Sequence, residues 1–403
     1  MYTVAASFEF LLSFAFACLI IPLSYTERCL PNMTIFDAIK KPTLLLDEEQ
    51  TRKNILWMVQ KANAEDIRLR PHFKTHQSAA IGEWFREAGV TAITVSSVDM
   101  AAYFADYGWK DITIAFPVNW REMDEINALA QRVKLNLLVE SVESAQFLDE
   151  HLEKPLDVWL KIDVGNQRTG LSKEDPKTLA KVASAIESSP KMNLKGLLTH
   201  AGQTYRAGSV EAIQHIHLDT LAQFKYIKNY LAVLGIARLE MSVGDTPTAR
   251  LAPEFGPMIN ELRPGNFVFF DAHQLEIGSC CSNEISVVLA CPVVAKHPKR
   301  NEVVIYGGAI HLSKDTIQAD GQTAYGLAAL PEDNSWGAPL EGAFVRGLSQ
   351  EHGIVRLSPE DFERAQVGDI LCILPAHSCL TLDCMGELLS LEGERITTMS
   401  TRT

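Results

Sequence analysis

The sequence predicts an α/β chain built as a (β/α)8 barrel of the TIM type, followed by a mostly β C-terminal domain. Short β-branched or apolar runs alternate with helical periods from residue 43 to residue 272. Eight strand candidates occur in that stretch, as many as the barrel requires. After residue 272, helical periods become scarce and short apolar runs are separated by Gly and Pro. A doubly wound open sheet is the competing fold, because counting strands does not separate the two.

The predicted elements follow from this periodicity. The eight strand candidates are 67–72, 92–96, 112–117, 135–140, 158–164, 194–200, 239–243 and 267–271. Helices are predicted over 47–66, 78–88, 100–106, 122–130, 144–151, 179–186 and 210–234. Strands of the second domain are predicted at 285–295, 302–306, 353–357 and 370–374, with a helical turn near 359–364. We therefore divide the chain into an apolar extension (1–32), the barrel (33–272) and a β domain (273–403).

Composition bounds the class of protein. The chain has 403 residues, of which 47% are hydrophobic and 22% charged, as in ordinary globular proteins. Its net charge of -13 argues against a nucleic-acid partner, because a negative surface repels the phosphate backbone. Small anionic ligands remain compatible, since local backbone amides bind them. Eight cysteines form no CxxC pair, which indicates free thiols and a cytoplasmic location.

The N-terminal extension has two interpretations. Residues 10–23 are nearly all apolar, about the length of a signal-peptide core and short for a membrane span. No Lys or Arg precedes Arg28, so the basic start of a signal peptide is missing. Either the segment is a weak signal or anchor, which would make the protein periplasmic or membrane-anchored, or it lies upstream of a true start at Met33.

Polar side chains cluster after four of the predicted strands. They occur in segments 72–76, 163–170, 199–205 and 243–248. Because a barrel of this type carries its chemistry at the C-terminal ends of its strands, four polar ends predict an active site there. Lys74, between two histidines and without an acidic neighbour in sequence, is a candidate Schiff-base lysine, although a solvated lysine is the common case. Arg168 is a candidate anion partner or a salt-bridge residue.

A second group of candidates lies near the C-terminus. His377 and Cys379 follow a predicted strand, and in an extended chain they would share one face. Imidazole and thiolate together suit zinc, although a single His-x-Cys pair is more often not a metal site. Two protein ligands are fewer than the usual three or four. A metal held here would therefore have water and substrate as further ligands, which describes a catalytic ion.

These segments together resemble one enzyme family. The sequence from Arg70 to His76 is similar to the cofactor-lysine motif of the D-serine dehydratase and D-threonine aldolase family, pyridoxal-phosphate (PLP) enzymes of fold type III related to alanine racemase. The resemblance extends in order over segments 163–170, 199–205, 244–248, 261–271, 349–353 and 375–379. It spans roughly residues 40–390, and it implies a PLP-binding barrel followed by a β domain. It also implies a homodimer in which the β domain helps to close the partner's site.

The resemblance assigns roles to residues. Lys74 would carry the cofactor, Arg168 would bind its phenolate oxygen, Tyr205 would lie near the pyridine nitrogen and His200 beside the ring. Further cofactor contacts would come from Gly244, Asp245, Thr246 and Asn266. Because Asp245 is an acid where many relatives have a small residue, we expect its side chain to turn away from the phosphate. His377 and Cys379 match the metal pair, with zinc preferred over manganese or magnesium.

The activity implied is that of a lyase acting on D-configured β-hydroxy amino acids. Lys74 would remove the α-proton, and the metal would make the β-hydroxyl a better leaving group. D-serine or 3-hydroxy-D-aspartate would then give a keto acid and ammonia. The alternative is a D-threonine aldolase, with His352 or His200 as the base that takes the hydroxyl proton. A racemase, a non-catalytic PLP carrier and a metal-only hydrolase are more distant alternatives.

Overall fold

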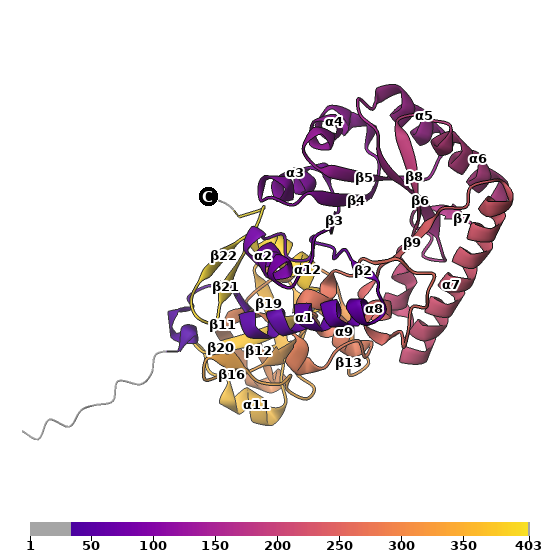
Figure 1. The fold of residues 1–403 in the computed structure, drawn as a ribbon. Coiled ribbons are helices and arrows are strands. Elements are labelled where there is room, and N and C mark those ends of the chain that lie inside the picture. Colours follow the sequence, from indigo (N-terminus) through magenta and orange to yellow (C-terminus); the bar gives the residue numbers. More distant parts are fainter. Residues whose placement is uncertain (1–33, 402–403) are drawn as a thin grey trace, which may run out of the picture. The chain divides into compact units, whose positions relative to one another are not determined.

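Eight parallel strands form a barrel in the computed structural model, which describes residues 34–401 (Figure 1). The strands are β2 (Arg68–Leu69), β3 (Ile93–Val95), β4 (Asp111–Pro117), β5 (Lys134–Val139), β6 (Leu156–Asp163), β8 (Met192–Leu198), β9 (Glu240–Val243) and β10 (Glu261–Leu262). They pair in the order β2-β10-β9-β8-β6-β5-β4-β3, and β7 (Leu171–Ser172) pairs with β6. A parallel bridge between His72, just after β2, and Thr94 in β3 joins the first and last strands of this order, so the sheet closes. The expected barrel is confirmed, and the open sheet is excluded.

Helices connect the barrel strands, and α3 to α7 lie around their outer side (Figure 1). The helices are α1 (Glu48–Ala64), α2 (Ala79–Glu87), α3 (Val98–Asp106), α4 (Met123–Arg132), α5 (Val142–His151), α6 (Pro176–Glu187), α7 (Val210–Val233) and α8 (Thr246–Leu251). Six of them follow an Asp or Ser whose side chain accepts a hydrogen bond from the first turn: Asp47, Ser97, Ser141, Asp175, Ser209 and Asp245. These caps satisfy amides that would otherwise lack partners. Five of these six helices begin within three residues of the predicted positions, whereas α8 was not predicted.

The second domain is built on a nine-stranded sheet of mostly antiparallel strands. Its order is β12-β19-β18-β15-β20-β11-β1-β21-β22. The strands are β1 (Thr43–Leu46), β11 (Val287–His297), β12 (Glu302–Tyr306), β15 (Gly326–Ala329), β18 (Phe344–Leu348), β19 (His352–Arg356), β20 (Ile370–Pro375), β21 (Glu387–Ser390) and β22 (Arg395–Thr397). Strand β1 precedes the barrel in the chain, yet it pairs with β11 and β21.

Smaller elements complete the β domain and its connections. Two hairpins are formed by β13 (Ile317–Ala319) with β14 (Gln322–Ala324), and by β16 (Pro331–Glu332) with β17 (Ser335–Trp336). Short helices are α9 (Ala272–Glu276), α10 (Ala309–Leu312), α11 (Pro359–Arg364) and α12 (Ser378–Met385). The predicted turn at 359–364 is therefore confirmed as α11.

One predicted strand is wrong. Residues 267–271 were expected to form the eighth strand, but Asn266–Val268 is a 3-10 helix and β10 takes that place. Phe270 has a φ of 53°, which a strand does not allow. The apolar run at 267–270 is buried core of an irregular segment. Strand β10 lacks such a run, because it contains the buried carboxylate of Glu261.

The apolar segment at residues 10–23 and its two interpretations lie outside the described residues. Between residues 34 and 401, no helix combines the length and apolar character that crossing a membrane requires.

Candidate active site

A cavity of about 750 Å³ opens at the C-terminal ends of the barrel strands. Most of the residues predicted for the chemistry line it: Lys74, Arg168, His200, Tyr205, Asp245, Asn266, His377 and Cys379. Its volume lies in the range of small-molecule sites. The barrel strands β2, β6, β8 and β9 and the β-domain helix α12 therefore contribute to one site.

Lys74 is positioned by the burial of its neighbours. The backbone amide of Phe73 donates to the carbonyl of Thr94 at 2.8 Å, which fixes the segment after β2 against β3. The ring of Phe73 is fully buried and contacts Phe104 and Trp109 at about 5 Å between ring centroids. Because Phe73 points into the core, Lys74 is left at the cavity.

The two histidines that flank Lys74 have different surroundings. His76 is buried against the rings of Phe73 and Phe85, and burial lowers its pKa to about 3. His76 does not line the cavity, so it belongs to the core. His72 lines the cavity, and burial together with the charge of Lys74 lowers its pKa well below the ordinary value. Both imidazoles are therefore neutral near pH 7.

His200 is neutral and has a defined tautomer. Its Nδ1 lies 2.5 Å from the carbonyl oxygen of Gly244, so Nδ1 carries the proton and Nε2 is an acceptor. Burial, followed by the charges of Lys74 and Arg168, lowers the pKa of His200 to about 3. This imidazole suits contact with a cofactor ring, whereas so low a pKa makes it a weak proton acceptor near pH 7.

The predicted phosphate loop, residues 244–248, lies only partly at the cavity. Asp245 lines it, whereas Gly244 and Thr246 do not. The carboxylate of Asp245 accepts hydrogen bonds from the amide of Thr248 (2.8 Å) and the hydroxyl of Thr204 (3.0 Å). The amide of Thr246 donates to the Tyr205 hydroxyl at 3.3 Å. The donors at the start of α8 thus have partners within the chain, and burial raises the pKa of Asp245 to about 6.

Other features of the cavity fit a cofactor such as PLP. Gly265 lines the wall where a Cβ would come within 2.9 Å of the His72 carbonyl oxygen and the Thr75 hydroxyl. The Oδ1 atom of Asn266 is buried and has no hydrogen-bond partner among residues 34–401. Together with the Lys74 amine and the neutral His200 ring, these groups leave room and polar contacts for a phosphorylated pyridine.

The candidate metal pair lies where β20 ends and α12 begins. His377 precedes α12 with an extended backbone, and Cys379 lies in its first turn, so the pair is not on an extended strand as expected. Nδ1 of His377 lies 2.7 Å from Oδ2 of Asp315. The Cys379 sulfur lies 3.3 Å from the Thr75 hydroxyl and 3.7 Å from Nδ2 of Asn266. The residue next to Lys74 therefore touches the metal pair.

The electrostatics of this pair suit a cation. Burial acts against the charged form of His377, but the Cys379 thiolate and Asp315 outweigh it and raise the pKa of His377 to about 11. Burial acts to raise the pKa of Cys379, but His377 and Lys74 outweigh it and the pKa is lowered. Without a metal, a protonated imidazole pairs with the thiolate, and a metal ion would bind here by displacing that proton. Within the described range, no group of three or more such ligands occurs.

Several residues of the cavity were not predicted. Lys161 and Arg263 are buried cations, Arg206 and His273 lie at its wall, and Asp271 and Asp315 are carboxylates. Oδ2 of Asp271 accepts from Nδ2 of Asn266 (2.6 Å) and the amide of Ser378 (3.0 Å), so it joins the barrel to α12. Lys161 could have been recognised as a cavity residue, because it is a charged residue within the otherwise apolar strand β6.

His352 is not brought to this cavity. It begins β19, its side chain is exposed, and it does not line the cavity of its own chain. Its catalytic role stays a prediction.

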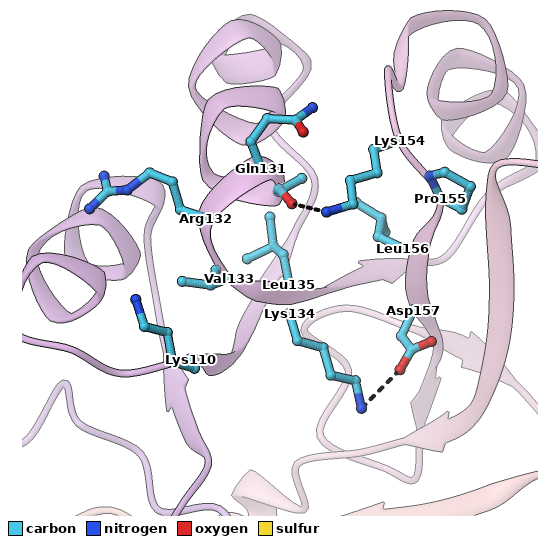
Figure 2. A pocket seen from close by; sticks show the side chains of 11 residues that line it. Lys110, Gln131, Arg132, Val133, Lys134, Leu135, Lys154, Pro155, Leu156 and Asp157 are labelled. Carbon is cyan, nitrogen blue, oxygen red and sulfur yellow. Dashed lines mark hydrogen bonds and ion pairs between the residues drawn. The ribbon is translucent and has the colours of Figure 1, made fainter.

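A smaller hollow of about 390 Å³ lies at the opposite ends of the strands (Figure 2). It is lined by the starts of β4, β5 and β6 and by lysines with nearby partners. Nζ of Lys134 lies 3.5 Å from Oδ2 of Asp157, and Nζ of Lys154 donates to the Ala130 carbonyl at 3.3 Å (Figure 2). Because the chemistry of such barrels occurs at the other end, we do not assign the active site here.

Comparisons with known proteins point to enzymes. Over 349 residues the chain is 29% identical to D-threo-3-hydroxyaspartate dehydratase of Delftia sp. (strain HT23), covering 84% of this chain and 91% of that one. It is 26% identical to the D-serine dehydratase of Dictyostelium discoideum (85% and 91% covered) and 28% identical to the 3-hydroxy-D-aspartate aldolase of Paracoccus denitrificans (88% and 89%).

Solved structures agree with these sequences. The structure of the Delftia dehydratase superposes with a TM-score of 0.83 at 27% identity, covering 90% of this chain and 98% of that one. A mutant of that enzyme, described as its metal-free form, superposes equally well. The family model for the alanine racemase N-terminal domain matches residues 46–273, and a putative serine dehydratase domain matches residues 286–391. The chain therefore belongs to the alanine racemase N-terminal domain family, in the branch that carries a serine dehydratase domain.

Proposed function

We propose that this protein is a PLP- and divalent-metal-dependent lyase that eliminates water from D-configured β-hydroxy amino acids, giving a keto acid and ammonia. The observation that carries the proposal is the contact between Thr75, next to Lys74, and Cys379, 304 residues further along the chain. It brings the proposed cofactor lysine and the proposed metal pair to one cavity. The names of the dehydratase relatives support the same activity.

Lys74 and its neighbours would carry out the removal of the proton from the α-carbon. When bound, PLP supplies a ring that delocalises the electrons of the broken Cα–H bond. The Lys74 amine would take the α-proton, because it is an amine that lines the cavity. Arg168 would hold the phenolate oxygen of the cofactor, and the neutral ring of His200 would lie beside its ring.

The proposed metal pair would activate the hydroxyl group on the β-carbon. Nε2 of His377 and Sγ of Cys379 would hold a divalent ion, and zinc suits one imidazole and one thiolate better than manganese or magnesium does. A bound ion supplies a Lewis acid for the β-hydroxyl. Asp315 keeps the His377 ring oriented through Nδ1, so that Nε2 is free for the metal.

The first test is spectroscopic and chemical. The purified protein should absorb near 420 nm, and Lys74→Ala should lose that band. With D-serine or 3-hydroxy-D-aspartate, we expect keto acid and ammonia in equal amounts, and we expect a chelator to abolish their release. Interconversion of D- and L-serine that survives the chelator, without keto acid, would favour a racemase, and a protein without the 420 nm band would contradict the proposal.

A second candidate function is that of a D-threonine aldolase. It is supported by the 28% identity to the 3-hydroxy-D-aspartate aldolase of Paracoccus denitrificans, and its base would be His352 or His200, of which His200 lines the cavity. In that case the Cα–Cβ bond breaks, and D-threonine gives glycine and acetaldehyde. Acetaldehyde from D-threonine, without keto acid from any substrate, would replace the dehydratase by the aldolase.

We also propose that the active protein is a homodimer. The exposed His352, remote from the cavity of its own chain, supports a role for it in the site of a second copy.

A further inference from the structure

We propose that Arg206 recognises a carboxylate on the β-carbon of the substrate, so that the preferred substrate is 3-hydroxy-D-aspartate rather than D-serine. The inference rests on the proposed lyase function and deepens it by naming the substrate class.

Arg206 is the cationic side chain of the cavity to which no cofactor contact and no protein partner has been assigned. Lys74 is assigned to the cofactor and Arg168 to its phenolate oxygen. Lys161 and Arg263 are buried and donate to protein oxygens, Lys161 to the Ile162 carbonyl at 2.9 Å and Arg263 to the Ser242 hydroxyl at 2.7 Å. Arg206 lines the same cavity with an exposed side chain. In the described part of the chain, no carboxylate forms an ion pair with Arg206.

Arg206 lies on the side of the cavity that carries the metal pair. Its neighbour Tyr205 accepts a hydrogen bond at its carbonyl from Nε2 of His273, at 2.8 Å. Helix α9, which carries His273, packs against β13, and Ala272, Ile317 and Ala376 lie in one buried cluster next to His273, Asp315 and His377. Nδ1 of His377 lies 2.7 Å from Oδ2 of Asp315. The backbone beside Arg206 is therefore bonded to the helix that packs near the proposed metal pair, and Arg206, His273, Asp315 and His377 all line the cavity.

The chemistry of the substrate explains why a guanidinium stands there. The metal pair would hold the hydroxyl on the β-carbon, so any other substituent of that carbon faces the residues around the pair. This substituent is hydrogen in D-serine, methyl in D-threonine and carboxylate in 3-hydroxy-D-aspartate. A guanidinium binds a carboxylate through two parallel hydrogen bonds, and neither hydrogen nor methyl offers it a partner. The nearby carboxylate of Asp315 is not the partner of Arg206, because it is paired with His377.

The experiment compares two substrates in four proteins. We would measure kcat/KM for 3-hydroxy-D-aspartate and D-serine in the wild type, Arg206→Gln, Arg206→Lys and Arg238→Gln. Arg238 is the matched control, because it is exposed and does not line the cavity. We expect Arg206→Gln to lose about 10- to 100-fold on 3-hydroxy-D-aspartate and less than about twofold on D-serine. Arg206→Lys should recover part of the loss, and Arg238→Gln should match the wild type.

A binding measurement separates this inference from the proposed function. D-aspartate and D-alanine lack the β-hydroxyl and do not eliminate water, and their binding is followed by the absorbance of the cofactor. Arg206→Gln should weaken D-aspartate and leave D-alanine unchanged. Equal losses for both ligands or substrates, or no loss, would overturn the role of Arg206. A wild type that binds D-aspartate selectively yet releases no product from any substrate would overturn the lyase function alone.

Discussion

At the proposed metal pair, the imidazole of His377 is oriented by Asp315, whose Oδ2 lies 2.7 Å from Nδ1. A carboxylate behind a metal-binding histidine fixes the tautomer and makes the ring a stronger ligand. We expect Asp315→Asn to weaken zinc binding about 10- to 100-fold, measured by competition with a coloured chelator.

The control for this change is Asp333→Asn, an exposed residue between β16 and β17 that does not line the cavity. It should bind zinc as the wild type does. An unchanged zinc affinity in Asp315→Asn would show that the His377 ring is held in some other way.

The buried carboxyl of Asp245 predicts a pH dependence of cofactor binding. Its pKa is raised to about 6, so it is largely neutral at pH 5 and charged at pH 8. A charged carboxylate at the cavity wall repels the phosphate of PLP. Asp245→Asn should therefore bind PLP roughly tenfold more tightly at pH 8 and about equally at pH 5, as measured by fluorescence titration.

Asp175→Asn is the matched control, because Asp175 caps α6 by the same type of hydrogen bond at a site exposed to solvent. It should leave PLP affinity unchanged at both pH values. A weaker affinity in Asp245→Asn at pH 8 would mean that the cap of α8 matters more than the charge.

Individual side chains were predictable where they follow a strand directly. Arg168, His200 and Tyr205 follow strands whose apolar runs are plain in the sequence, whereas Lys74 follows the polar strand β2, and all four line the cavity. Asp315 and Asp271 were not predicted, because their partners His377 and Ser378 lie 62 and 107 residues away. No local pattern contains such pairs, and only the assembled β domain brings them together.

Among the elements, β10 closes the barrel through buried charges. The carboxylate of Glu261 is inaccessible and accepts hydrogen bonds from Arg68 (2.8 Å), Arg70 (2.7 Å) and Ser242 (2.8 Å). Glu261→Gln would leave the buried Arg70 with Asp111 as its remaining carboxylate partner. We expect it to lower the free energy of unfolding by about 3 kcal/mol, measured by urea denaturation.

The comparison for this variant is Glu49→Gln on α1, which removes an ion pair with Lys53 between exposed side chains. It should leave the free energy of unfolding nearly unchanged, because water screens an ion pair between exposed side chains. A similar small change in Glu261→Gln would show that the arginines find other partners.

The elements that were predicted well carry their own signal. Strands β4, β5 and β6 contain apolar runs buried on both faces, and the neighbouring helices α3 and α5 have capped starts. Strand β10 has two residues, one of them Glu261. It is held in the barrel by ion pairs from Glu261 to Arg68 in β2 and to Arg70 just after β2. The run at 267–270 was mistaken for a strand because hydrophobicity alone does not distinguish a strand from a buried irregular segment.

For the whole molecule, the exposed His352 predicts sites shared between two chains. Lys74→Ala and His352→Ala should each be inactive alone if His352 serves the partner's cavity. Mixing equal amounts under conditions of subunit exchange should restore about a quarter of the wild-type activity, because half of the dimers then contain one complete site. The measurement is keto-acid release after mixing.

The control mixture combines Lys74→Ala with Arg168→Ala, whose residues both line the cavity of one chain. It should stay inactive, since neither cavity of a mixed dimer is complete. Activity of His352→Ala alone would contradict the catalytic role of this residue.

Strand β1 also affects how the chain folds as it is synthesised. Its residues Thr43–Leu46 pair with Val287–Ala290 on β11 and with Leu389–Ser390 on β21. A growing chain therefore exposes an apolar strand with two open edges until more than 240 residues have followed it. The barrel has all of its strands well before that partner leaves the ribosome, so it has the opportunity to fold first. Until then β1 is a site for chaperones or for mispairing between nascent chains, and slower translation after the barrel would lengthen that exposure.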